Sequence, residues 1–133
     1  MTPASDSESI TIPLDQSAIV YASATGSIQP ARIGPLLRQA QAYLCQLYDE
    51  YQRQYECTIE TDGRAIFLVP AGHWTTLADE IGCSSRAIDA IARAHAEQLR
   101  RLGRQTDRRD EFETALEIRD AIVIGTDTLD NNP

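Results

Sequence analysis

Arginine residues recur at helical spacing along the second half of the chain. At 100° per residue, four of them fall within an arc of about 40° on a helix predicted for residues 84–102. These are Arg86, Arg93, Arg100 and Arg104. An arc of about 80° on the opposite side holds the apolar stripe and His95. A guanidinium can hold a phosphate through two parallel N–H donors, so the pattern indicates a phosphate-binding flank.

The charge around this helix differs in sign from that of the whole chain. Residues 93–109 contain six arginines against Glu97 and Asp107, whereas the chain carries a net charge of −8. An alternative interpretation is a solvated face, since Arg93, Glu97 and Arg101 are spaced for intrahelical ion pairs. Asp89 on the same helix would repel phosphate. Both interpretations stay open at this stage.

Residues 75–91 resemble the helix-turn-helix family of DNA-binding modules. Ala78 stands where two helices would touch, and Gly82 stands at the tight turn. The apolar positions around the turn are Leu77, Ile81, Cys83, Ile88 and Ile91. The resemblance implies a dimeric regulator whose recognition helix presents its first residues to base edges. The residues expected to contact double-stranded DNA are Ser84, Ser85, Arg86, Arg93, Arg100, Arg101 and Arg104.

Apolar and aromatic side chains also follow a helical spacing from Ser27 to about Tyr55. The pattern predicts one helix of about six turns, in which Pro35 sets either a kink or the true start. Its length suggests a homodimer interface formed by Tyr43, Leu47, Tyr48, Tyr51 and Tyr55. Packing within the core of the chain itself is the simpler alternative, and a stacking platform for bases is a third.

The composition bounds the class of protein. The 133 residues are 42% apolar, with 20 acidic and 12 basic residues, and every basic residue is an arginine. These values predict one packed domain and exclude a membrane protein, a disulfide scaffold and a repeat array. The acidic, lysine-free composition resembles that of uncharacterised proteins of salt-loving archaea, although an arginine-rich codon bias would also explain it. Three scattered cysteines indicate free thiols and a cytoplasmic location.

The order of the predicted elements indicates an α+β domain over residues 10–126. A hairpin at residues 57–69 turns at Asp62-Gly63, and a strand near residues 120–125 is expected to join it. Helices are expected at 16–25, 73–81, 84–102 and 111–117, with Gly26 and Gly103 as stop signals. The segments 1–9 and 127–133 are expected to be disordered tails.

The remaining chemistry-bearing residues predict no catalytic, cofactor or metal site. His95 lies in the apolar stripe and is expected in the core, and His73 is expected to cap or pack a helix start. No set of four metal ligands and no glycine-rich phosphate loop occurs in the sequence. The sequence therefore favours a non-enzymatic binding protein. It is either a helix-turn-helix regulator or an oligomeric protein-interaction subunit without nucleic-acid binding.

Overall fold

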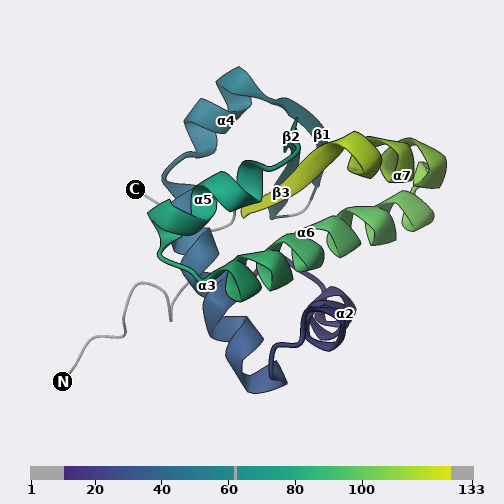
Figure 1. Cartoon of the computed structure of the whole chain (residues 1–133). Helices are drawn as coiled ribbons and strands as arrows, with labels where there is room; N and C mark the ends of the chain where they lie inside the picture. Colours follow the sequence, from purple (N-terminus) through teal and green to yellow (C-terminus); the bar gives the residue numbers. More distant parts are fainter. Residues whose placement is uncertain (1–10, 62, 127–133) are drawn as a thin grey trace.

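The computed structural model describes residues 11–61 and 63–126, which form an α+β fold as predicted (Figure 1). The helices are α2 (Gln16–Gly26), α3 (Pro30–Cys45), α4 (Tyr48–Gln54), α5 (His73–Ile81), α6 (Ser85–Gln105) and α7 (Arg109–Ile118). The strands are β1 (Glu56–Thr61), β2 (Arg64–Pro70) and β3 (Arg119–Gly125). The predicted tails, 1–9 and 127–133, lie outside the described residues.

The three strands form one antiparallel sheet in the order β1-β2-β3. The predicted hairpin is confirmed, with Gly63 at a φ of 77° in the turn, and β3 is the predicted third strand. The side chains of Ala65, Ile66 and Phe67 are fully buried, as are the three residues opposite them on β3. A short, apolar, β-branched run such as Ile122–Ile124 therefore forms a strand inside the core.

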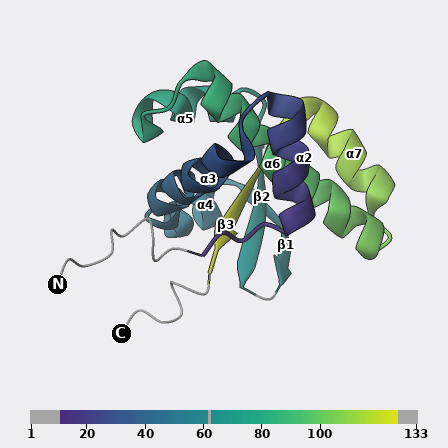
Figure 2. The same ribbon diagram turned by 90° about the horizontal axis from the view of Figure 1, so that it is seen from below.

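Helix α6 is the central helix of the fold. Its apolar stripe is buried, and Ser84 caps its first turn by accepting a hydrogen bond from the amide of Ala87 at 3.1 Å. The sheet lies on one side of α6 and α2 lies on the other (Figures 1 and 2). Helix α2 runs antiparallel to α6, because Asp15 at its start contacts Gln98 and Gly26 at its end lies against Ala90. This arrangement leaves one long side of α2 at the surface.

Buried polar side chains replace a fourth strand along the free edge of β3. His95 Nδ1 accepts a hydrogen bond from the amide of Val123 at 2.9 Å. Gln41 donates to the carbonyl of Val123 at 2.6 Å and accepts from the amide of Gly125 at 3.0 Å. The indole of Trp74 donates to the carbonyl of Ala121 at 3.0 Å. The edge is thus satisfied without a partner strand, which buried backbone groups require.

The prediction of one helix from Ser27 to Tyr55 is wrong. The helix begins at Pro30. The missing N–H of this proline costs no hydrogen bond, because amides in the first turn of a helix have no intrahelical acceptor, and Pro35 is accommodated in the early turns. A turn at Gln46 and Leu47 separates α3 from α4, and the amides of both residues bond to carbonyls three residues earlier. The tyrosines of the stripe therefore do not share one rigid rod: Tyr43 lies on α3, Tyr48 and Tyr51 lie on α4, and Tyr55 follows the end of α4.

Gly103 does not end the second long helix, contrary to the prediction. Helix α6 continues to Gln105, and Gly103 lies where α7 crosses it. A Cβ atom on Gly103 would lie 2.9 Å from the ring of Phe112 and 3.3 Å from the carbonyl oxygen of Arg108. The absence of a side chain here permits close helix packing instead of a left-handed cap. None of the helices in the described ranges is long and apolar enough to cross a bilayer.

Candidate functional site at helices α5 and α6

The segment that resembles a helix-turn-helix does form two helices joined by a tight turn. Gly82 adopts a φ of 87°, and the amides of Gly82 and Cys83 both bond to the carbonyl of Ala78 at 2.9 Å. Leu77, Ile81, Ile88 and Ile91 are buried between the helices and the core. Gly82 and these four apolar residues therefore form the turn and its buried side, whereas Ala78 and Cys83 are half-buried.

The arginines of α6 are paired with carboxylates of the same chain. Arg93 contacts Asp89 at 2.7 Å, and Glu97 receives Arg100 at 3.6 Å and Arg104 at 3.3 Å. The ion pairs continue past the helix with Arg108–Glu111 at 2.6 Å and Arg109–Glu113 at 3.1 Å. Arg86 is exposed and has no ion pair among the described residues. Two carboxylates, Asp89 and Glu97, thus offset half of the charge of the four-arginine stripe before any partner arrives.

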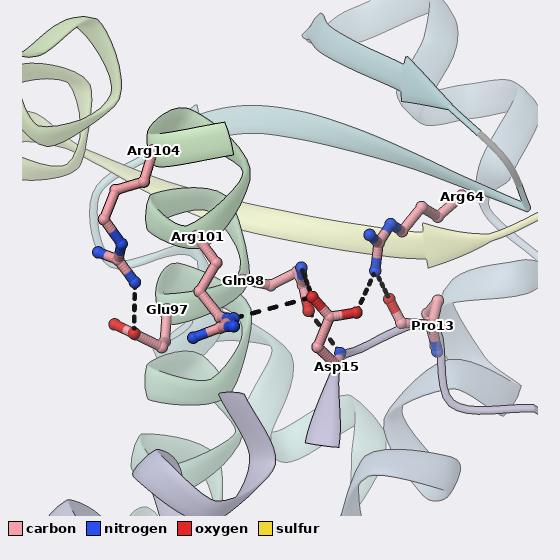
Figure 3. Close-up of polar contacts among 7 residues, drawn as sticks. All are labelled: Pro13, Asp15, Arg64, Glu97, Gln98, Arg101 and Arg104. Carbon is pink, nitrogen blue, oxygen red and sulfur yellow. Dashed lines mark hydrogen bonds and ion pairs between the residues drawn. The ribbon is translucent and has the colours of Figure 1, made fainter. Parts of the chain in front are cut away.

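Arg101, which is not part of the stripe, joins a network around Asp15 (Figure 3). Asp15 accepts a hydrogen bond from Gln98 at 3.0 Å and lies 3.5 Å from Arg64 and 3.8 Å from Arg101. The Gln98 hydrogen bond and the two guanidinium groups hold the pKa of Asp15 below its ordinary value. This network connects the start of α2 to α6 and to β2, so Arg101 has a structural role here.

A hollow of about 500 Å³ lies between α5 and α6, and Ser85, one of the residues expected to contact DNA, lines it. Its walls include Asp79, Asp89 and Asp120, together with the hydroxyl groups of Thr75 and Ser85. No basic side chain of the described residues lines it. We call this space the acidic hollow. Its charge is opposite to the one that a phosphate backbone requires.

A second, smaller hollow of about 180 Å³ lies beside the first. Arg93, Arg100 and Arg119 line it, and we call it the arginine hollow. Trp74, Ala92 and Asp120 line both spaces, so the two hollows share a wall. Sequence reasoning missed this site because Arg119 comes from the start of β3, far from α6 in the sequence.

The tyrosines expected at a dimer interface pack largely within their own chain. Tyr51 is buried, lies edge-on to Phe67, and forms a 2.5 Å hydrogen bond with His73. Tyr55 is half-buried against the rings of Tyr51 and His73. The hydrogen bond to Glu80 raises the pKa of Tyr43 to about 12. Leu47 and Tyr48 are half-buried against the core. Core packing, the simpler alternative, therefore accounts for most of this stripe.

A surface that the sequence analysis overlooked lies on α2. Val20 is 57% exposed and Tyr21 40% exposed. Beside them is a hollow of about 300 Å³, lined mainly by Ile19, Val20, Ala24, Ile28, Pro30 and Ile33, which we call the apolar hollow. The signal was present in the sequence, because the sixteen residues from Gln16 to Ala31 contain no charged side chain. Because apolar and small residues are spread around the whole helix, the sequence pattern did not indicate which side of α2 faces solvent.

The histidines and cysteines are placed as structural residues. His95 is fully buried with one backbone hydrogen bond, as predicted, and burial lowers its pKa to about 3. His73 packs among tyrosines at the start of α5, and burial lowers its pKa. Burial raises the pKa of the Cys45, Cys57 and Cys83 thiols, which are free. Within residues 11–61 and 63–126, no cluster of side chains is arranged to hold a metal ion.

Comparison with known families gives one match. Residues 12–126 match DUF8048, described as a domain of unknown function. The chain belongs to the DUF8048 family. No curated protein and no solved structure matches it. The DUF8048 match runs from Ile12 to Thr126, so it contains all the helices and strands described above, along with the three hollows.

Proposed function

We propose that this DUF8048 protein is a non-enzymatic interaction subunit of the cytoplasm that forms a homodimer through α2. The contact surface consists of the exposed side of α2 and the apolar hollow beside it. Two copies would meet about a two-fold axis, with Val20 and Tyr21 of each copy against the apolar hollow of the other. This proposal moves the predicted dimer contact from the tyrosine stripe to α2.

The observation that supports the proposal is the pairing of an exposed apolar ridge with an apolar hollow on one uncharged face. Val20 is exposed and lines the hollow itself, and the exposed Tyr21 follows it on α2 without lining the hollow. A two-fold contact needs both a projection and a recess on one surface, because each copy presents the same patch. Except for Ile33, which lines the hollow, both features are within the charge-free segment from Gln16 to Ala31.

The charge distribution of the chain also favours a dimer contact through the surface of α2. Each copy carries a net charge of −8, so most approaches of two copies bring like charges together. A contact through α2 avoids this cost locally, since it desolvates no charged side chain of that helix. An eleven-residue helix is about 16 Å long, which makes the contact small and the expected dissociation constant micromolar.

DNA binding is the second candidate, and it rests on the tight turn at Gly82 and on Arg86, which pairs with no carboxylate in the described part of the chain. The carboxylates within the arginine stripe and the acidic hollow between α5 and α6 oppose it, because they repel a phosphate backbone. Helix α2 also occupies one side of α6. We therefore treat duplex binding as the competing outcome of the experiment below.

The experiment is sedimentation velocity over a range of protein concentrations, with two matched variants. Val20→Asp places a charge on the proposed contact, and Ile118→Asp does the same at a 66% exposed apolar residue on α7, away from α2. We expect the wild type and Ile118→Asp to dimerise at similar concentrations. Val20→Asp should stay monomeric over that range, with an unchanged circular dichroism spectrum.

A fluorescence polarisation titration with duplex DNA fragments completes the test. The proposal is overturned if the wild type is monomeric at hundreds of micromolar, a range that covers weak dimers. It is also overturned if both aspartate variants shift the association equally. Duplex binding that Arg86→Ala weakens would establish the second candidate in its place.

A further inference from the structure

The two charged hollows beside α6 form one groove with separated charges. Trp74, Ala92 and Asp120 line both the acidic hollow and the arginine hollow, so a ligand could extend from one into the other. Asp79 and Asp89 line only the acidic hollow, Arg93, Arg100 and Arg119 line only the arginine hollow, and Asp120 stands on the wall between them. The combined space falls within the usual size of small-molecule sites in proteins.

The arginines keep donors available for a ligand. Arg93 uses Nε in its contact with Asp89, and Arg119 uses Nη1 in its contact with Glu56. Arg100 meets Glu97 only at 3.6 Å, which is longer than a hydrogen bond. A guanidinium has five N–H donors, so each arginine can bind an anion in the arginine hollow and keep its present partner.

The acidic hollow offers the complementary groups. Asp79 has no ion pair among the described residues. Asp120 uses Oδ2 to accept a hydrogen bond from the amide of Trp74 at 3.3 Å. Its other oxygen accepts no hydrogen bond in the described part of the chain. An ammonium group can donate three hydrogen bonds, which suits carboxylates and the nearby hydroxyl groups of Thr75 and Ser85.

We infer that this groove binds a small zwitterion, with its phosphate or carboxylate in the arginine hollow and its ammonium group in the acidic hollow. Trp74 and Ala92 supply the apolar wall along which the short carbon chain of the ligand lies. The site is independent of the α2 surface, because no residue that lines the groove lines the apolar hollow.

The test is an NMR titration of the ¹⁵N-labelled full chain with O-phosphoethanolamine at fixed ionic strength. Inorganic phosphate and ethanolamine, each alone, serve as the half-ligand controls. We expect shifts at Trp74, Ala92 and Arg119, and an affinity for the zwitterion about tenfold or more above that for either half, since two charged contacts act together. Glycine, as the carboxylate zwitterion, distinguishes the two possible anionic groups.

Charge-neutralising variants identify the two halves of the site. Arg100→Gln is expected to weaken phosphoethanolamine binding about tenfold, and Asp79→Asn to weaken it similarly. The matched controls are Arg109→Gln and Asp110→Asn, which alter exposed residues of α7 outside the groove. Thermal unfolding of each variant checks that the fold is retained.

A second kind of variant blocks the groove without changing its charge. Ala92→Phe fills the shared wall and should abolish binding while the protein stays folded. The inference is overturned if the zwitterion produces no shifts in the groove at concentrations up to tens of millimolar. It is equally overturned if phosphate alone binds as well as phosphoethanolamine, or if the control variants weaken binding as much as Arg100→Gln.

Discussion

The imidazole of His95 accepts a hydrogen bond from the amide of Val123 at 2.9 Å, inside the core and at the free edge of the sheet. Because Nδ1 is the acceptor, the ring is neutral in the folded protein. Burial lowers the pKa of His95 from 6.5 to about 3. The unfolded chain therefore binds a proton, between these two values, that the folded chain does not bind.

This difference predicts that stability decreases as the pH falls from about 6.5 towards 3. Each such histidine changes the free energy of unfolding by about 1.4 kcal/mol per pH unit between its two pKa values. Burial also lowers the pKa of His73, which acts in the same direction. Urea unfolding between pH 7.5 and pH 5 measures the slope. His95→Asn keeps an acceptor near the Nδ1 position and should reduce the slope by about one proton. An unchanged slope would contradict the assignment.

The buried side chain of Gln41 is predicted to contribute strongly to the stability of the fold. Its amide is the partner of two backbone groups of β3, the carbonyl of Val123 and the amide of Gly125. Gln41→Leu keeps the approximate volume but leaves both groups unsatisfied in the core, which costs about 2–4 kcal/mol. Gln46→Leu alters an exposed glutamine of the same region and should cost less than about 0.5 kcal/mol. Equal losses in chemical denaturation would refute this role.

The sequence predicted the elements whose signals are local. The turn at Gly63, the helix from His73 to Ile81 and the strand at Ile122–Ile124 follow from glycine placement and apolar periodicity. The turn at Gln46 and Leu47 carries neither glycine nor proline, so only tertiary packing could reveal it. The same holds for Gln41, since its partners lie more than 80 residues away.

Gly103 and Gly34 provide a matched pair of helical glycines for a stability measurement. A Cβ on Gly103 would meet Phe112 at 2.9 Å and the backbone of Arg108 and Arg109 at 3.3 Å. Gly103→Ala is therefore expected to destabilise the protein by about 1–3 kcal/mol through overpacking of α6 against α7. Apart from its chain neighbours, a Cβ on Gly34 would meet only the end of Arg38 at 3.7 Å. Gly34→Ala should be close to neutral, because the gain in helix propensity is offset by the contact of the new Cβ with the ring of Pro35, the next residue of the helix. The order of the two melting temperatures checks the prediction.

The candidate site shows where periodicity stops being informative. The apolar periodicity of the sequence correctly separated the buried side of α6 from the side that carries Arg93 and Arg100. It could not show that Arg101 faces Asp15, because that contact depends on the antiparallel packing of α2. It also could not show that Arg119 joins Arg93 and Arg100. Charge partners and groove walls come from elements distant in the sequence.

Added salt is predicted to have opposite effects on dimerisation through α2 and on binding to duplex DNA. An α2 dimer joins two chains of net charge −8 through an uncharged apolar surface. Raising the salt from about 0.15 M to 1 M shortens the screening length from about 8 Å to 3 Å, which reduces the repulsion between the copies. We therefore expect dimerisation to become stronger with salt in sedimentation experiments. Binding to duplex DNA would instead weaken steeply over the same range, because counterions compete for the phosphates.

The salt dependence of dimerisation by Val20→Asp tests whether the contact on α2 is apolar. A new carboxylate at the contact adds one charge to each copy, and the two would face one another across the proposed two-fold axis. High salt screens that repulsion but does not restore the lost apolar contact, so Val20→Asp should remain weaker than the wild type even at 1 M salt. Ile118→Asp adds the same charge away from α2 and should keep the salt dependence of the wild type. Association that decreases with salt in the wild type would contradict an apolar contact.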